Sequence, residues 1–349
     1  MAALAALDPK PGQMPPRELR GPSERVLHLF LSRNGGPCAR SVALAELGST
    51  GYVEVPVLRE DTTKHALAAA AQLRPTVVFS QTQAPSLDAA FFRSLRNAAG
   101  NPKELVIVNW SGDMDNHNAP SLHALQWAVE AATEVDVTAW VSLTHVDLLR
   151  SAGVPSVYLQ AGYDKELFFE ATDEEWGTAF DVAFLFHEHH PNFGLSLGRH
   201  NDCPARTEAG AALRAAFGQR ATVGATQSEG VTASATYRKT RLAVSISGSC
   251  TLERCTSNRL FHAMAATATA VKRFTGHESF GLKHEENCLL FNTTEELIAL
   301  AQHWTKPEQR QQLRQIRRAG AALARADFTW HARVQELRPI LAAVRQARV

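Results

Sequence analysis

The sequence predicts an α/β protein with parallel sheets, and three observations carry this prediction. The chain has 349 residues, which favours two domains over one. Hydrophobic residues make up 45% of it, enough to build two cores. Short apolar runs typical of buried strands alternate with segments of helical length, as in a parallel sheet with crossover helices.

The first half of the chain supplies the elements of one such sheet. Residues 1–24 contain prolines and charges rather than a secretory apolar core, so we expect a flexible N-terminal arm. We expect an N-terminal Rossmann-like domain over residues 25–165, with helices at 39–47 and 86–99. Its expected strands are residues 26–31, 76–79, 105–110, 139–142 and 156–159.

The second half repeats the pattern after a linker near residues 162–177. A C-terminal domain is expected over residues 175–335, and its first strand is residues 180–186. Further strands are expected at residues 241–247 and 269–271, and arginine-rich helices at residues 307–326 and 329–349. Residues 336–349 are expected to form the final helix.

Composition narrows the class of protein. The net charge is +1, so no global field attracts nucleic acid or an anionic membrane. No apolar run is long enough to span a bilayer. Five cysteines without CxxC spacing indicate free thiols, mostly buried, in a reducing compartment. We therefore expect a cytoplasmic protein.

A segment that begins at Cys255 has the features of an anion-binding helix start. Thr256 or Ser257 is expected to cap the helix, and Arg259 follows as a cation inside the first turn. The N–H groups and the dipole of a helix N-terminus attract phosphate. An ordinary amphipathic helix with a solvated Arg259 is the alternative for this segment alone.

The residues before this helix favour the functional interpretation. Residues 241–247 form an apolar strand-like run, and the polar loop 248–254 then brings a second cation, Arg254. Strand, glycine-containing loop and helix follow in the order in which open parallel sheets bind nucleotides beyond their strand ends.

Several features in order resemble a known family. Residues 256–265, Thr-Ser-Asn-Arg-Leu-Phe-His-Ala-Met-Ala, parallel the element S-x-R-x-x-E-A-M-A, and the strand at 269–271 follows. Further matches are segments 285–291, 294–297, 306–310 and 328–333, and, more weakly, residues 158–164 with Phe168. Over about residues 230–335 the chain thus resembles GT-B glycosyltransferases, specifically the CgeB-like and spore-coat group with a glycosyl transferase family 1-type C-terminal domain.

The resemblance implies a fold and a donor substrate. The fold would be two doubly wound Rossmann-like domains facing a cleft, with the C-terminal helix returning to the first domain. The donor would be a nucleotide-diphosphate sugar, with UDP as the nucleotide. Its base and ribose would lie near Gly224 and His262, and its diphosphate near Arg254, Arg259 and the helix start at Ser257.

The chain departs from the family at two positions. Retaining relatives hold a pair of glutamates eight positions apart, and this chain has Arg254 and His262 there. An imidazole can still hydrogen-bond a ribose hydroxyl, whereas a guanidinium cannot accept from a sugar hydroxyl. The departure favours inversion of configuration, and it also leaves open a degenerate domain that binds a nucleotide or a partner without catalysis.

The loop after the strand at 105–110 is the strongest catalytic candidate in the first domain. Residues 109–118 concentrate two carboxylates, an imidazole and three carboxamides. A general base must lie within hydrogen-bond reach of the acceptor hydroxyl, and Asp113 is our first choice, before Asp115 and His117. An Asx-rich turn whose side chains bond their own backbone is the alternative.

Three weaker candidates follow other strands. Gly35 and Gly36 could let the first loop approach the donor phosphate or the acceptor, with Arg33 or Arg40 adding charge, although a plain turn is the simpler explanation. The amides of residues 80–83 could contact a sugar. Thr144 could cap a helix with His145 exposed, or the pair could contact substrate.

A histidine-rich segment raises the possibility of a metal site. His187, His189 and His190 precede His200, Asp202 and Cys203, and imidazole and thiolate are ligands that zinc favours. Alternate residues of an extended segment point in opposite directions, and no second pair with zinc-site spacing follows. We expect no metal, and a substrate contact through His187 or Arg199 is the more natural hypothesis.

The sequence therefore predicts a metal-independent glycosyltransferase that requires no cofactor. Its acceptor hydroxyl is not identified by the fold. A glycan, lipid-linked sugar or surface protein is the default that the resemblance implies. Glycosylation of 5-hydroxymethylated pyrimidines in DNA, as in bacteriophage enzymes, is the alternative that a set of C-terminal arginines suggests, although a solvated helix face would explain them equally: Arg310, Arg314, Arg317, Arg318, Arg325, Arg333 and Arg338.

Overall fold

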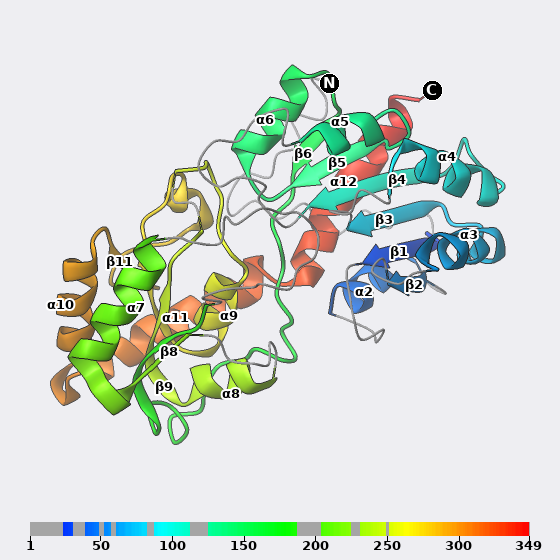
Figure 1. Ribbon diagram of the computed structural model, residues 1–349. Coiled ribbons are helices and arrows are strands. Elements are labelled where there is room, and N and C mark those ends of the chain that lie inside the picture. Colours follow the sequence, from blue (N-terminus) through cyan, green and yellow to red (C-terminus); the bar gives the residue numbers. More distant parts are fainter. Residues whose placement is uncertain are drawn as a thin grey trace. The chain divides into compact units, whose positions relative to one another are not determined.

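The computed structural model shows two compact units (Figure 1). Unit 1 contains Met1–Ala161 and Trp330–Val349, and unit 2 contains Gly162–Thr329. The residues that the structure describes are 24–30, 39–48, 52–56, 61–81, 87–111, 125–186, 204–224, 231–248 and 251–348.

Unit 1 is built on a six-stranded sheet in which every pair of neighbours is parallel. The strand order is β2-β1-β3-β4-β5-β6. The order reverses between β1 and β3, which makes this gap the topological switch point of the sheet. The strands are β1 (Val26–Phe30), β2 (Tyr52–Pro56), β3 (Val77–Gln81), β4 (Val106–Ser111), β5 (Val137–Trp140) and β6 (Ser156–Tyr158).

Helices cover both faces of this sheet. One face presents Leu29, Val78 and Ile107 to a core shared with α3 and α4. On the other face Trp110 of β4 packs against Trp330, the first residue of α12, with ring centroids 5.3 Å apart. The helical elements of the unit are α2 (Ala39–Leu44), η1 (Ala45–Leu47), α3 (Thr62–Leu73), α4 (Ala89–Ala98), α5 (Gln126–Ala131), α6 (Leu143–Ser151) and α12 (Trp330–Gln346).

Ion pairs join the end of α12 to residues that lie just before β1 and β5 of the sheet. Arg345 donates to both carboxylate oxygens of Glu24, which is buried before β1, at 2.6 and 2.9 Å. Arg348 pairs with Asp136 at the start of β5. The C-terminal helix therefore returns to the N-terminal sheet, as expected.

Unit 2 repeats the architecture with five parallel strands in the order β11-β10-β9-β7-β8. If β7 to β11 are numbered 1 to 5, the order is 2-1-3-4-5, which is also the order of the first five strands of unit 1. The switch point of the second sheet thus lies between β7 and β9. The strands are β7 (Phe180–Phe184), β8 (Ala221–Val223), β9 (Thr240–Ser245), β10 (Ala268–Lys272) and β11 (Leu289–Phe291).

The core of unit 2 lies between this sheet and three helices. Val182, Leu242 and Ala270 face Leu213 of α7 and Leu297 of α10, and α11 adds further apolar side chains. The helical elements are α7 (Pro204–Phe217), η2 (Gly218–Arg220), α8 (Val231–Arg238), α9 (Arg259–Ala266), η3 (His277–Phe280), α10 (Thr294–Trp304), η4 (Pro307–Gln309) and α11 (Arg310–Asp327).

The predicted α/β class with parallel sheets is confirmed, and the structure corrects details. The strand expected at residues 139–142 is β5 at 137–140, and β2, β8 and β11 were not predicted. Asn109 and Ser111, expected at the start of a loop, are buried in β4. Ser80 of β3 and Thr138 of β5 are the register partners of Asn109, so three buried polar residues lie side by side across the sheet at this level.

Among the described residues, no helix has the length and apolar character needed to cross a membrane. The predicted buried thiols include Cys288, which is fully buried. Burial raises the pKa of this thiol to about 12, so it stays protonated at neutral pH.

A glycine sets the close approach of α11 to the loop before β11. A Cβ on Gly320 would lie 2.5 Å from the carbonyl oxygen of Asn287. That loop is held by Asn287 itself, whose side-chain amide donates to the carbonyl of Gly281 at 2.8 Å. The contact is with backbone, so a side chain cannot rotate away to make room.

We predict that Gly320→Ala destabilises the protein, although the same change in a helix normally stabilises by about 1 kcal/mol. Overpacking should lower the free energy of unfolding by roughly 1–3 kcal/mol in urea titrations. Gly210→Ala in α7 is the comparison, because its Cβ would meet only side-chain atoms, Cγ1 of Val223 at 3.1 Å and the ring of Phe186 at 3.3 Å, so its destabilisation should be the smaller of the two. A stabilised Gly320→Ala variant would contradict the packing described.

His28 is an ionisable group enclosed in the first sheet. It is fully buried on β1 and stacks on Phe30, with ring centroids 5.2 Å apart. Burial, and then the charge of Arg40, hold the pKa of His28 well below its ordinary value. The imidazole is therefore neutral in the folded protein.

We predict that His28 makes the protein less stable in acid. The unfolded chain takes up a proton at this position below pH about 6.5, and the folded protein does not, so the free energy of unfolding falls by up to ~1.4 kcal/mol per pH unit below that value. Urea titrations across this range should show a weaker pH dependence for His28→Phe. His65→Gln, at an exposed position, should keep the wild-type slope.

Candidate functional site

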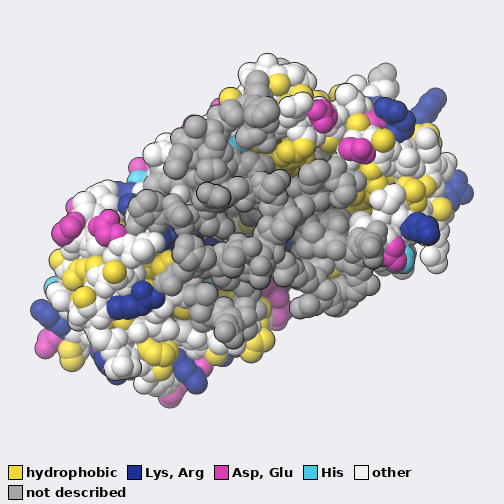
Figure 2. Space-filling view, viewed as in Figure 1, with side chains coloured by type: hydrophobic (Ala, Val, Ile, Leu, Met, Phe, Trp, Pro, Cys, Tyr) yellow, Lys and Arg dark blue, Asp and Glu magenta, His cyan; other side chains and the backbone are white. Residues whose placement is uncertain are grey.

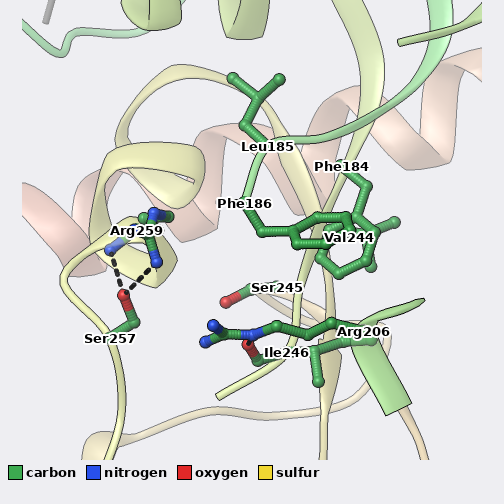
Figure 3. A pocket seen from close by; sticks show the side chains of 9 residues that line it. All are labelled: Phe184, Leu185, Phe186, Arg206, Val244, Ser245, Ile246, Ser257 and Arg259. Carbon is green, nitrogen blue, oxygen red and sulfur yellow. Dashed lines mark hydrogen bonds between the residues drawn. The ribbon is translucent and has the colours of Figure 1, made fainter. Parts of the chain in front are cut away.

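A pocket lies at the carboxyl ends of β7 and β9 in unit 2, at the switch point of the sheet (Figure 3). Ligands of open parallel sheets bind at this place because the reversal of strand order separates the two loops that leave it. The residues that line the pocket are Phe184, Leu185, Phe186, Arg206, Val244, Ser245, Ile246, Ser257 and Arg259.

The start of α9 contributes Ser257 and Arg259, as the sequence predicts. The Ser257 hydroxyl accepts from the backbone N–H of Arg259 at 3.3 Å and from its guanidinium at 3.4 Å. The expected cap residue is wrong by one or two positions: Asn258 holds the N-cap without a side-chain hydrogen bond. Thr256 is buried beside it.

A second arginine in the pocket was not predicted. Arg206 lies near the start of α7, and its Nε donates to the carbonyl of Ile246 at 3.0 Å, just after β9. Figure 3 shows its guanidinium extending toward Ser257 and the start of α9. Pro204 at the first helical position was the available signal, because proline there marks a helix start.

The environment of the two guanidinium groups favours a multiply charged anion. Phe184 and Phe186 form an apolar wall with ring centroids 4.5 Å apart. The dipole of α9 adds positive potential at its N-terminus. Cations beside an apolar wall are screened less than cations in open solvent. Arginine forks match the geometry of phosphate oxygens, so the arrangement can hold a diphosphate.

Arg254 lies on the loop before α9 and does not line this pocket. Its backbone has a positive φ of 53°, and its N–H donates to the carbonyl of Thr275 at 2.8 Å. A Cβ on Gly276 would lie 2.8 Å from Cγ of Arg254, so the glycine allows this approach. Only one of the two predicted cations therefore lines the pocket: Arg259 does, and Arg254 lies on the loop before the helix start.

His262 lies one turn beyond Arg259 on α9, and aromatic rings hold it. Its imidazole stacks on Phe168 with a centroid distance of 3.9 Å and an interplanar angle of 4°. Tyr163 approaches it edge-on at 6.5 Å. Burial raises the pKa of Tyr163 to about 12, so this neighbour is uncharged. Stacking fixes the ring plane and directs hydrogen bonds of His262 along its edge.

Gly224 follows β8, and its conformation explains why glycine stands there. Its φ is 110°, a backbone region that side chains rarely adopt. Its N–H donates to the carbonyl of Phe184 at 3.0 Å, which extends the pairing with β7 toward the pocket wall.

Two of the weaker candidates are corrected. Ser80 and Gln81 belong to β3 rather than to the loop after it. Ser142 is the N-cap of α6, so Thr144 lies inside the helix rather than at its cap position. His145, expected to be exposed, is fully buried and stacks on Trp140 at 5.2 Å.

The remaining candidates lie outside the described residues, and their roles stay predictions. They are Gly35, Gly36 and Arg33 in the first loop, Asp113, Asp115 and His117 after β4, and His187, His189, His190, Arg199, His200, Asp202 and Cys203 before α7.

The C-terminal arginines have partners within their own unit. Arg317 is buried, donates to Asp173 at 2.8 Å and lies over Trp176 at 4.8 Å. Arg314 and Arg318 pair with the same aspartate. Arg333 pairs with Glu336. Figure 2 shows basic side chains of the described residues lying singly among other kinds on the visible face, rather than as one continuous patch.

Comparison with solved structures identifies the fold of this chain. The structure is similar to Anabaena HepE in complex with UDP and glucose, with a TM-score of 0.61 and 12% identity over 92% of this chain and all (100%) of that one. It is similar to sucrose-phosphate synthase from Thermosynechococcus elongatus (TM-score 0.59, 12% identity, 93% of this chain and 100% of that one). A glycosyltransferase from Rickettsia africae matches with a TM-score of 0.58 and 10% identity, over 92% and 98% of the two chains. The chain has the GT-B fold.

The sequence places a family domain within this fold. Residues 212–338 match the family model described as glycosyl transferase-like. The predicted resemblance and the glycosyltransferase class are thereby confirmed at the level of fold and domain. A comparison with curated protein sequences finds no match.

Proposed function

We propose that this protein transfers a sugar from a nucleotide-diphosphate sugar, with UDP as the nucleotide, to a hydroxyl group of an acceptor. The observation that carries the proposal is the meeting of Arg206, Ser257 and Arg259 in one pocket at the switch point of the second sheet. A fold relative, HepE, was solved with UDP-glucose and with UDP and glucose, which supports this choice of donor.

The two arginines would stabilise the leaving diphosphate. Negative charge grows on its oxygens as the glycosidic bond breaks, so donors held in place beforehand stabilise the transition state more than the bound substrate. The guanidinium groups of Arg206 and Arg259 would supply this charge, and we propose that no divalent metal is required.

His262 and Gly224 would contact the nucleoside. The edge of the His262 imidazole, held by the stack on Phe168, would hydrogen-bond the ribose. Gly224 would let the base approach the backbone at the end of β8. Arg254, on the loop before α9, would add positive potential near the helix start.

We propose Asp113 as the general base that takes the acceptor proton, with Asp115 and His117 as its alternatives. Asp113 follows Ser111, the last residue of β4, by two positions in the sequence. A base on the acceptor side, together with Arg254 in place of the glutamate of retaining relatives, favours inversion at the anomeric carbon.

The acceptor would be a glycan, a lipid-linked sugar or a protein. Five of the arginines that suggested DNA have other contacts: Arg314, Arg317 and Arg318 pair with Asp173, Arg310 lies over Trp176, and Arg333 pairs with Glu336. The described residues therefore do not favour that alternative. A degenerate domain that binds a nucleotide without turnover is distinguished by the assays below.

We predict that Arg259→Ala and Arg206→Ala each weaken UDP binding by about 10- to 100-fold, since a hydrogen bond to a charged group is worth ~1.5–3 kcal/mol. Titration calorimetry with UDP measures this without an acceptor. Arg318→Ala is the control, because it removes an exposed arginine of the same unit. Wild-type affinity in both pocket variants would show that the diphosphate binds elsewhere.

We predict that transfer inverts the anomeric configuration and persists with EDTA present. Mixtures of nucleotide sugars are incubated with glycan, lipid-linked and hydroxymethylated DNA acceptors, and proton NMR of the product gives the anomer. Asp113→Asn should lower turnover by at least about 100-fold with UDP affinity unchanged. Retention would remove the role of Asp113, and UDP binding without any release from a sugar donor would indicate a degenerate binder.

A further inference from the structure

A second guanidinium site lies in unit 1, apart from the donor pocket. Arg40 of α2 lies beside two indole rings, at 5.2 Å from the centroid of Trp110 and 4.9 Å from that of Trp330, and these two centroids are 5.3 Å apart. Its Nη1 also donates to the side-chain carbonyl of Gln81. Trp110 is itself fixed, because its indole N–H donates to the carbonyl of Leu159 at 2.9 Å.

The position of this cluster in the sheet points to a ligand. Gln81 is the last residue of β3, and Trp110 is its register partner on β4, so both lie at the carboxyl edge. Arg40 lies on the helix that follows β1. The cluster therefore stands beside the β1/β3 switch point, where open parallel sheets bind their ligands.

The chemistry of the cluster favours an oxyanion. Cation–π contact engages a face of the guanidinium, whereas hydrogen bonds to phosphate or carboxylate oxygens run in its plane, so both kinds of contact can be made together. The indoles also exclude water from the cation, which strengthens its attraction for an anion. The positive charge of Arg40 also contributes to the lowered pKa of His28, so it acts on other groups of unit 1.

We propose that Arg40, held by Trp110, Trp330 and Gln81, binds an anionic group, phosphate or carboxylate, on the acceptor substrate. The proposal rests on the proposed function in one respect only: the ligand of unit 1 is taken to be the acceptor. It narrows the acceptor to molecules that carry a negatively charged group.

The test observes the tryptophans directly. Indole ¹⁵N–H signals of the full-length protein are assigned with Trp110→Phe and Trp330→Phe, and saturating UDP occupies the donor pocket. Inorganic phosphate, glucose 6-phosphate, glucuronate and glucose are then titrated at constant ionic strength. The phosphate compounds and glucuronate separate phosphate from carboxylate recognition, and glucose reports a neutral sugar.

We expect the Trp110 and Trp330 signals to shift with at least one anionic probe and not with glucose. Arg40→Gln should weaken this binding by about tenfold or more, and Arg40→Lys should recover part of it. Arg93→Gln, an exposed position of the same unit, should bind as the wild type does. Shifts with glucose equal to those with the anions, no shift with any anion, or wild-type binding by Arg40→Gln would overturn the proposal.

These outcomes are separate from those for the proposed function. UDP binding and sugar transfer with no anion response at Trp110 and Trp330 would leave the donor site standing and refute the acceptor-side site. An anion response without release of UDP from any donor would support the acceptor-side site and refute the proposed sugar transfer.

Discussion

The order of strands in the two parallel sheets is the constraint on which the chemistry depends. All strands of a sheet point the same way, so every strand releases its loop at one edge, and a single reversal of order separates two neighbouring loops. In unit 2 this reversal lies between β7 and β9, and the pocket that contains Arg206 and Arg259 lies there. The same order in unit 1 brings Arg40 beside its own switch point.

Arginine has two separate uses in this protein. Some arginines pair with carboxylates and stabilise packing, and others line the pocket. Arg317 is buried against Trp176, and Asp173 neutralises its charge, so it stabilises the packing of α11. Arg206 instead donates to the backbone carbonyl of Ile246, which positions its side chain at the pocket. It lines the pocket together with Arg259, and for that reason these two arginines, rather than the C-terminal ones, support the proposed function.

The part of the site that could be predicted is local in sequence. Ser257 and Arg259 follow a strand and a loop within about twenty residues, and the helix-start pattern identifies both without tertiary information. Arg206 could not be found in this way, because its role depends on a hydrogen bond to Ile246, forty residues away, across two neighbouring elements. His145 shows the opposite failure: a polar residue near a helix start is expected at the surface, but Trp140 covers it.

The shift of the cap from Ser257 to Asn258 has a consequence for binding. Ser257 accepts from the N–H and the guanidinium of Arg259, so the hydroxyl positions the cation instead of closing the helix. Asn258 holds the cap position without using its side chain, so its carboxamide does not occupy the first-turn N–H groups. The N–H groups of the first turn are nonetheless engaged, because Leu260 donates to the carbonyl of Ser257 at 3.1 Å and Phe261 to that of Asn258 at 3.0 Å. The helix start therefore contributes its dipole and the guanidinium of Arg259 to the proposed diphosphate site, rather than unoccupied N–H groups.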